Sequence, residues 1–250
     1  MLETNKIYLG NCLNLMPEIE TGSIDMILCD LPYGTTACKW DTIIPFEPLW
    51  EQYKRIIKPN GAIVLFGSEP FSSALRMSNI KNYKYDWIWE KNKAGNFSLA
   101  RKNPMKYHEN ISVFYKYFPT FNLINLKSLD KPILSSRKNK AANLGHGNKD
   151  GIIYYQKESG FHNSILRYSN KSGKGYSFHP TQKPVLLMEY LIKTYTNEGE
   201  LVLDNCIGSG TTAIACLNTK RNFIGMEQEQ KYFDIANKRI ADLQSQNVLF

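Results

Sequence analysis

The chain has 250 residues, of which 42% are hydrophobic and 22% charged, with a net charge of +8 and a pI near 9.1. This length and composition predict one folded domain with an insertion. No apolar run approaches the roughly 20 residues that span a bilayer, and the first residues lack the apolar core of a signal peptide, so we expect a soluble intracellular protein. Five cysteines without a C-x-x-C pair argue against a disulfide framework or a zinc site.

The first half of the chain alternates apolar runs with amphipathic stretches. Strands are predicted at Ile7–Leu9, Ile24–Cys29, Ala62–Phe66, Tyr85–Trp89 and Ile111–Tyr115, and helices at about Leu13–Glu20, Phe46–Ile57 and Glu69–Asn79. The residues Lys58-Pro59-Asn60-Gly61 are typical of a helix stop, so we expect a turn before the third strand. Trp87 and Trp89 share one face of the fourth strand, a spacing that is more typical of packing than of binding.

The strand at 24–29 leads into Asp30-Leu31-Pro32-Tyr33 and then Gly34. This tetrad places a carboxylate, a backbone carbonyl and an aromatic ring at the carboxyl end of a strand. The carboxylate and the carbonyl can each accept one N–H of a planar amine, while the ring stacks on the heterocycle that bears the amine. Alone, the pattern is more typical of a turn with a packed aromatic residue, so its meaning depends on the rest of the chain.

The middle of the chain, residues 118–177, differs in composition and reads as an insertion between residues 1–117 and 178–250. Between Tyr117 and Phe178 there are ten lysines and arginines against three acidic residues, so this segment carries +7 of the net charge of +8. Such a concentration indicates a polyanionic partner. Scattered aromatic residues predict a small core or a contact face, and disorder of part of the segment is the alternative.

The last part of the chain returns to alternating strands and helices. Helices are predicted at about Pro184–Tyr195, Thr211–Leu217 and Gln228–Leu243, and strands at Leu201–Leu203 and Asn222–Gly225. Nearly continuous apolar strands between helices are typical of a parallel sheet that is covered on both faces. We therefore predict an α/β fold with a Rossmann-like, mostly parallel sheet.

A glycine loop in this last part predicts a nucleoside site. Asp204 ends one strand, and Asn205-Cys206-Ile207-Gly208-Ser209-Gly210 turns into the helix that begins Thr211-Thr212. Glycines at such a turn let a ligand approach the backbone, whereas Asp204 favours a cationic ligand over a phosphate. Glu227 follows the next strand, 23 residues after Asp204, at a position that suits a ribose diol. Upstream, His179, Thr181 and Lys183 in the segment 178–184 offer donors for a carboxylate.

These motifs together resemble the β-class DNA amino-methyltransferases, which use S-adenosylmethionine to methylate adenine N6 or cytosine N4. The matching segments are Asp30 to Tyr33, His179 to Pro184, Asp204 to Thr212, and Gly225 to Glu227 followed by Tyr232 and Ala236. Their order, with the tetrad before the glycine loop and a basic region between, is that of the β class. The resemblance covers residues 5–116 and 178–241, and it implies the class I methyltransferase fold with 118–177 as a target-recognition insertion.

The resemblance also implies roles for individual residues. The catalytic group would be Asp30, Leu31, Pro32 and Tyr33. The cofactor site would comprise Asn11, Cys12, Asp30, His179, Thr181, Lys183, Asp204, Cys206, Gly208, Ser209, Gly210, Thr211, Thr212 and Glu227. DNA would contact Lys127, Arg137, Lys138, Lys140, Arg167, Lys171 and Lys174. Asn11, Asn205 and Leu31 replace the family's usual Asp, Pro and Pro.

The resemblance favours adenine N6 over cytosine N4 as the target, because the family's N4 members usually begin the tetrad with Ser. The reaction would act on a flipped-out base in double-stranded DNA. Cytosine N4 methylation and a non-catalytic DNA-binding module that keeps the fold remain the alternatives. A homodimer and a cognate restriction endonuclease are candidate partners, and we expect a cytoplasmic protein associated with the nucleoid.

Overall fold

The computed structural model of the protein describes residues 2–35, 41–136, 153–169 and 182–247. The chain divides into two compact units. Unit 1 comprises Met1–Asn122 and Ser164–Phe250, and unit 2 comprises Leu123–Asn163. The second unit is therefore shorter than the insertion at 118–177, because the chain from Ser164 onward already belongs to unit 1.

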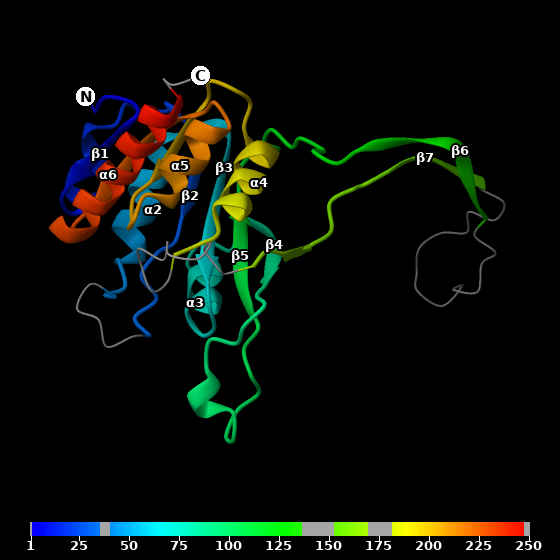
Figure 1. Ribbon diagram of the computed structural model, residues 1–250, viewed down its shortest axis with the longest axis horizontal. Helices are drawn as coiled ribbons and strands as arrows, with labels where there is room; N and C mark the ends of the chain where they lie inside the picture. The colour runs from blue at the N-terminus through cyan, green and yellow to red at the C-terminus, as the bar shows by residue number, and fades with distance from the viewer. Residues whose placement is uncertain (1, 36–40, 137–152, 170–181, 248–250) are drawn as a thin grey trace. The chain divides into compact units, whose positions relative to one another are not determined.

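Unit 1 is built on a sheet whose eight strands, in the described residues, have the order β1-β10-β9-β2-β3-β5-β4-β8 (Figure 1). The strands are β1 (Lys6–Leu9), β2 (Ile24–Cys29), β3 (Ile57–Gly67), β4 (Tyr83–Glu90), β5 (His108–Phe114), β8 (Ile165–Arg167), β9 (Leu201–Asp204) and β10 (Asn222–Glu227). Neighbouring strands are parallel except at β5, which runs antiparallel to both β3 and β4. The predicted mostly parallel α/β sheet is confirmed.

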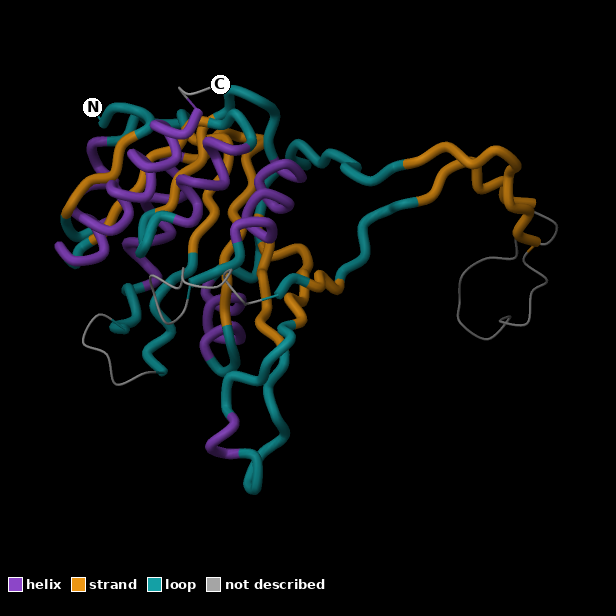
Figure 2. Tube along the Cα trace, in the orientation of Figure 1, coloured by secondary structure: helices purple, strands orange, loops and turns teal. Residues whose placement is uncertain are grey.

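Helices cover both faces of this sheet, as Figure 2 shows. They are α1 (Cys12–Leu15), α2 (Phe46–Ile56), α3 (Phe71–Ser78), α4 (Val185–Tyr195), α5 (Thr211–Asn218) and α6 (Gln230–Asn247). Successive side chains of a strand point to opposite faces. Accordingly, Met26 and Leu28 pack with α4, α5 and α6, whereas Ile27 and Cys29 pack with α1, α2 and α3. The two cores hold β2 in a fixed position, and Asp30 follows directly from it.

Two local predictions were wrong in their boundaries. The helix expected at 13–20 stops at Leu15 and continues as a 3-10 turn over Met16–Glu18, because Pro17 has no N–H for the α-helical ladder. The turn expected at 58–61 lies within β3, whose Ile57 pairs with Ile24 before a shift of register. A side chain at Gly61 would come within 2.8 Å of the Asp25 carbonyl, so this irregular part of β3 requires glycine.

The two tryptophans of β4 belong to the core. Trp87 is 3% exposed and Trp89 is 2% exposed. The indole N–H of Trp87 donates to the Tyr195 hydroxyl at 2.7 Å, and that of Trp89 donates to the Tyr168 carbonyl at 2.9 Å. Both polar groups are thus satisfied inside unit 1, so these residues pack rather than form a binding surface.

Unit 2 is an antiparallel pair of strands, β6 (Lys127–Ser136) and β7 (Ile153–Ser159). Gly160 follows β7 with φ +83°, and an added Cβ would meet the Asn125 carbonyl, so only glycine fits there. Tyr155 and Phe161 are more than half exposed. Their exposure favours the predicted contact face over a small core. None of the helices in the described residues has the length and apolarity that crossing a bilayer demands.

Candidate active site

Three acidic residues meet at one edge of the sheet. Asp204 ends β9, Glu227 ends β10 and Asp30 follows β2, and these strands are parallel neighbours. From β2 the chain proceeds to β3 on one side, whereas from β9 it proceeds to β10 on the other. Ligands of open α/β sheets bind at such a switch point, outside the carboxyl ends of the strands.

A cavity of about 470 Å³ lies at this edge, a size typical of small-molecule sites. Most of the predicted site residues line it, namely Asn11, Cys12, Asp30, Leu31, Pro32, Tyr33, Lys183, Asp204, Cys206, Gly208, Ser209, Thr211, Thr212 and Glu227. His179 and Thr181 lie outside the described residues. Gly210 does not line the cavity; it begins α5 in a left-handed conformation, and an added Cβ would lie 2.9 Å from that of Ala236 on α6.

The glycine loop and Glu227 hold each other in place. The Gly208 N–H donates to Glu227 Oε2 at 2.9 Å, and the Glu229 N–H donates to Oε1 at 2.8 Å. Gly208 has φ +54°, and no atom lies within 4 Å of where its Cβ would be. Burial raises the pKa of the Glu227 carboxyl. Each carboxylate oxygen keeps an acceptor site, so the pair suits a ligand with two adjacent hydroxyls.

Asp204 is a buried carboxyl group with neutral hydrogen-bond donors. It accepts hydrogen bonds from the Thr212 hydroxyl and from the Cys206 N–H, the latter at 3.1 Å. Burial raises its pKa to about 6. Among the described residues, none of the ion pairs involves Asp204. A cationic group of a ligand would therefore stabilise its ionised form.

Neutral groups of Asn11, Cys12 and Asn205 line the cavity, and Cys29 is fully buried close to Cys206. A hydrogen bond with Cys206 and burial raise the pKa of Cys12, and burial raises the pKa of Cys29 to about 12. These thiols are protonated at neutral pH, which makes them poor nucleophiles and poor metal ligands. Asn11 caps α1 by accepting the Leu13 N–H at 2.9 Å, and Asn205 accepts the Tyr53 hydroxyl at 2.5 Å. Both amide oxygens thus already hold one structural hydrogen bond.

The tetrad after β2 presents two acceptors. Asp30 Oδ1 accepts the Tyr33 hydroxyl at 2.6 Å, and the Tyr33 ring packs on Phe71 with 5.1 Å between centroids. The Leu31 side chain is buried in the core. No described residue donates a hydrogen bond to the Leu31 carbonyl. Burial and the neighbouring Asp30 hold the pKa of Tyr33 well above its usual value, so its hydroxyl remains a donor.

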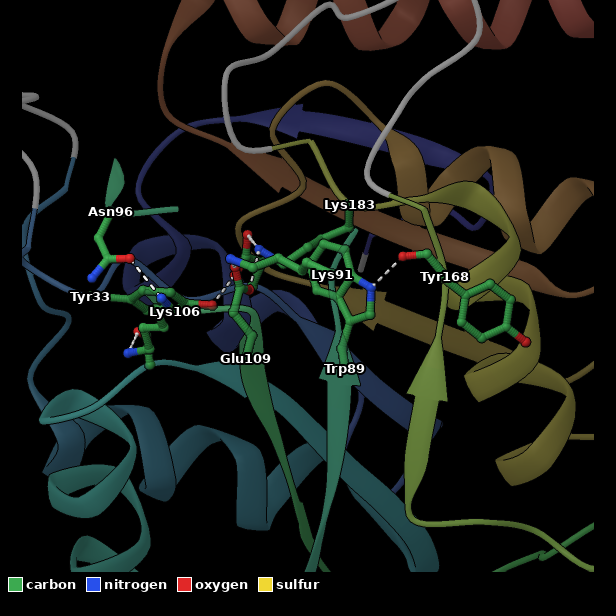
Figure 3. A network of polar contacts seen from close by, with 10 residues as sticks. Tyr33, Trp89, Lys91, Asn96, Lys106, Glu109, Tyr168 and Lys183 are labelled. Atoms are coloured by element: carbon green, nitrogen blue, oxygen red, sulfur yellow. Dashed lines mark hydrogen bonds and ion pairs between the residues drawn. The ribbon is translucent and has the colours of Figure 1, made fainter. Parts of the chain in front are cut away.

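A chain of alternating charges extends from the tetrad into the protein (Figure 3). Lys183 Nζ lies 2.5 Å from Asp30 Oδ2 and 3.3 Å from Glu109 Oε2. Glu109 Oε1 in turn lies 2.9 Å from Lys91 Nζ. Lys183 is 7% exposed, Lys91 11% and Glu109 15%, so water screens these contacts only weakly. We call Lys91, Glu109, Lys183 and Asp30 the charge chain.

The pKa values of its inner members reflect these contacts. Burial alone would lower the pKa of Lys183, but Asp30 and Glu109 together raise it above the ordinary value. Burial alone would raise the pKa of Glu109, but Lys183 and Lys91 together lower it. Both groups are therefore ionised at neutral pH. The carboxylates that the ammonium of Lys183 binds are thus two from the protein, whereas the family resemblance implies that this residue belongs to the cofactor site.

The sequence did not reveal the role of Glu109 and Lys91 in the site, although the segments 86–92 and 108–110 that contain them resemble family elements near the DNA-facing edge. Lys91 follows β4, and Glu109 is the second residue of β5, so the pairing of these strands brings both to the edge where β2 ends. The signals were the polar residues that follow Trp89 and the polar triplet His108-Glu109-Asn110 before an apolar strand. Many strands begin with polar residues, and the spacing of residues in the sequence does not show which strands will pair.

Two of the predicted DNA-contacting residues can be located. Lys127 lies on β6 in unit 2, and Arg167 lies on β8 in unit 1, where it pairs with Glu90 at 3.0 Å. The other five, Arg137, Lys138, Lys140, Lys171 and Lys174, lie outside the described residues. Arg167 is 68% exposed, so this ion pair is accessible to water and to other ligands.

The sequence of this chain is similar to those of known proteins. A family model described as DNA methylase matches residues 24–238. The Type II methyltransferase M.HpaI of Haemophilus parainfluenzae is 28% identical over 249 residues, covering 94% of this chain and 74% of the relative. M1.MboII of Moraxella bovis is 28% identical over 256 residues, covering 95% of this chain and 96% of the relative.

Solved structures agree with these matches. The crystal structure of the M1.HpyAVI–SAM complex has a TM-score of 0.63 and 27% sequence identity, and the match covers 94% of this chain and 98% of that one. The PvuII DNA methyltransferase (cytosine-N4-specific) has a TM-score of 0.68 at 15% identity, covering 95% and 86%. The second similarity is one of fold alone.

Proposed function

We propose that this chain, which belongs to the N6/N4 family of DNA methylases, methylates adenine N6 at a specific sequence in duplex DNA. The observation that carries the proposal is the pair of acceptors at the cavity, the Asp30 carboxylate and the Leu31 carbonyl. Lys183 and Tyr33 hold the carboxylate in place, and no described residue donates a hydrogen bond to the carbonyl. An acidic residue at the head of the tetrad favours adenine over cytosine, since the tetrad of N4 enzymes usually begins with Ser.

The methyl donor of the family is S-adenosylmethionine, and the cavity residues fit it. Glu227 and the open backbone at Gly208 suit its ribose diol, while Asp204, a buried carboxyl without a cationic partner among the described residues, suits its ammonium group. When bound, this cofactor supplies an electrophilic methyl group on its sulfonium. We assign the 206–212 loop to its methionine end. The cysteine side of the cavity, at Cys12, would face its adenine.

The chain's own residues would act on the target amine by orienting it. The lone pair of an exocyclic amine is delocalised into its ring, which makes the nitrogen a poor nucleophile. Asp30 and the Leu31 carbonyl each accept one N–H, which favours a pyramidal nitrogen, and Tyr33 stacks on the base. Catalysis would then consist of positioning and electrostatic stabilisation without a covalent enzyme intermediate.

Lys183 would serve as a positioning residue in this scheme. Its contact with Asp30 Oδ2 fixes one carboxylate oxygen, and Tyr33 fixes the other. Each oxygen retains a further acceptor site for the amine. Because Asp30 and Glu109 compensate its charge, and Lys91 in turn pairs with Glu109, the lysine can stay buried beside the cavity without a mobile counterion.

The substrate must leave the duplex to reach the cavity, at an unstacking cost of a few kcal/mol. We assign target recognition to the basic insertion at 118–177, which includes unit 2. The relatives are named Type II methyltransferases. We therefore propose that the protein protects host DNA from a cognate restriction endonuclease, and a second copy of the chain is a further candidate partner.

Sequencing that reports both modified bases tests the proposal. DNA from cells that express the protein should carry N6-methyladenine in one sequence motif, and DNA from cells expressing the Asp30→Ala variant should lack it. N4-methylcytosine at a motif would overturn the assignment of the base. The absence of both modifications from cells and from a tritiated-methyl transfer assay would instead favour the non-catalytic DNA-binding module.

The assignment of Glu227 predicts a selective loss of cofactor affinity. Glu227→Ala should weaken binding of S-adenosylmethionine by roughly 10- to 100-fold, the effect of losing hydrogen bonds to a charged group. Titration calorimetry measures this Kd. Glu229→Ala is the matched control, because its exposed side chain is two residues away and its backbone N–H remains. An unchanged Kd in the Glu227 variant would contradict the ribose assignment.

The pKa of Asp204, about 6, predicts that cofactor affinity depends on pH. A cationic ligand favours the ionised carboxyl, so the affinity for S-adenosylmethionine should fall roughly tenfold between about pH 7 and about pH 5. In the absence of ligand, Asp204 affects the stability of the fold in the opposite direction. Because its pKa is raised in the folded protein, this carboxyl contributes stability at low pH, and the contribution is lost as the pH rises through about 6. Asp204→Asn should bind more weakly and show neither trend, and an unchanged pH profile would refute the assignment.

A further inference from the structure

The loop that connects β4 and β5, residues 91–107, combines exposed apolar and cationic side chains. It contains five lysines and arginines and no acidic residue. Phe97 is 77% exposed and Leu99 is 44% exposed, and both belong to a short 3-10 turn at Phe97–Leu99. An exposed aromatic residue beside several cations is suited to binding a polyanion that also has apolar faces. The predicted DNA contacts all lie elsewhere, within 118–177.

This loop lies at the same edge of the sheet as the tetrad. Glu90 pairs with His108 where the loop leaves β4 and enters β5, and Asn110 pairs with Gly67 at the end of β3. The loop extends beyond that edge in Figure 1. Both ends of the loop are held by side-chain contacts: Lys91 binds Glu109 of the charge chain, and Lys106 donates to the Ser68 hydroxyl, which follows β3 (Figure 3).

Hydrogen bonds within the loop hold its tip in a defined shape. Asn96 accepts the Lys106 N–H at 2.6 Å and donates to the Pro104 carbonyl at 3.1 Å. The Gly95 N–H donates to the Lys106 carbonyl at 3.1 Å. These contacts tie the two sides of the loop together just before the turn that carries Phe97. Because the backbone around Phe97 is already ordered, the binding of a partner to this side chain would cost little further backbone entropy.

The charges divide into two groups. Lys91 and Lys106 point inward, to Glu109 and Ser68. Lys93, Arg101 and Lys102 are exposed, and none of the ion pairs among the described residues involves them. Cations of this kind bind phosphates, and phenylalanine is one of the side chains that proteins insert between base pairs.

We propose that the 91–107 loop binds the DNA beside the target base, with Phe97 inserted into the base stack and Arg101 and Lys102 on neighbouring phosphates. Phe97 would fill part of the space that the extruded base leaves, and so lower the cost of extrusion. This proposal rests on the proposed function, because it assumes that a base enters the cavity. It adds to the insertion a second DNA contact, made by unit 1 itself.

The first test compares two duplexes that contain the motif found by sequencing. In one duplex the target base is paired, and in the other it is mispaired, which lowers the cost of extrusion. Phe97→Ala should lower kcat/KM on the paired duplex by roughly tenfold, the effect of losing one aromatic stack, and much less on the mispaired duplex. Met77→Ala is the control: this apolar residue is 69% exposed and lies on α3, outside the loop.

The second test measures binding alone. Arg101→Gln/Lys102→Gln should reduce the slope of log affinity against log salt by about 2, one unit for each lost phosphate contact. The probe is a short unmodified duplex in the presence of S-adenosylhomocysteine, read by fluorescence anisotropy. Lys81→Gln, an exposed lysine before β4, should leave the slope unchanged.

The results of these tests can overturn the insertion of Phe97 and the phosphate contacts separately. Equal losses on the two duplexes, or none, would overturn the insertion of Phe97, and an unchanged salt slope would overturn the phosphate contacts. A change in sedimentation of Phe97→Ala with unaltered DNA binding would assign the loop to a protein interface instead. If the unsubstituted protein transfers no methyl group, the proposed function fails, while the anisotropy measurement still tests whether the loop binds DNA.

Discussion

Asp30→Ala should reduce methyl transfer by at least about 10²- to 10³-fold, the effect of removing one pre-positioned electrostatic contact from a reacting centre. The reason is geometric. Asp30 supplies one of two acceptors that orient the target amine, and no described side chain stands ready to replace it, because Glu109 already binds two lysines. DNA affinity should change little, since phosphate contacts dominate it. Single-turnover transfer of a tritiated methyl group measures the rate, and anisotropy measures binding.

The same substitution also removes a partner of buried Lys183, so a loss of fold must be distinguished from a loss of chemistry. Asp30→Ala/Lys183→Met removes both charges of the pair and should restore stability without restoring methyl transfer. Thermal unfolding and the Kd for S-adenosylmethionine report the fold in both variants. Turnover near the native rate in either variant would refute the role of Asp30.

The sequence was a good guide to the groups that follow parallel strands. Asp30, Asp204 and Glu227 each come at or directly after an apolar strand, and parallel neighbours bring their carboxyl ends to one edge. The alternation of strands and helices therefore predicted the fold class, while the assignment of these three carboxylates to one cofactor site came from the family resemblance. What each contributes follows from its local contacts, such as the Gly208 N–H on Glu227.

The sequence was a poor guide wherever strand pairing is non-local. β5 lies between β3 and β4 although it follows both in the chain, and this order brings Glu109 to Lys183. Neither periodicity nor spacing distinguishes this arrangement from a strand added at the sheet edge. β8 is a second example: Arg167 was assigned to the insertion, but its strand pairs with β4 in unit 1.

Lys183 illustrates a further limit, because two roles fit one motif. From the sequence, its ammonium could bind a carboxylate of the ligand or of the protein. The structure shows two carboxylates of the protein, contributed by the segment after β2 and by β5. The competition between these roles depends on distances, and no sequence pattern supplies those.

Among single changes in the charge chain, Lys183→Met should lower the free energy of unfolding the most. It leaves Asp30 without its cation and Glu109 with only Lys91, and breaking a buried ion pair in this way costs about 3–5 kcal/mol of the free energy of unfolding. Methyl transfer should fall by at least about tenfold even at temperatures where the variant is folded, because the Asp30 carboxylate is then held only by Tyr33. Denaturant unfolding and single-turnover rates measure the two effects separately.

Variants of Glu109 and Lys91, the outer half of the charge chain, test whether Lys183 acts by positioning Asp30. Glu109→Gln leaves two buried lysines opposed by Asp30 alone, so it should destabilise the fold. Glu109→Gln/Lys91→Met removes one charge of each sign and keeps the contact between Lys183 and Asp30. If Lys183 acts by positioning Asp30, this double variant should recover both stability and most of the methyl transfer rate, with an unchanged KM for DNA. Recovery of stability without recovery of rate would instead show that Glu109, which also lines the cavity, acts on the substrate itself.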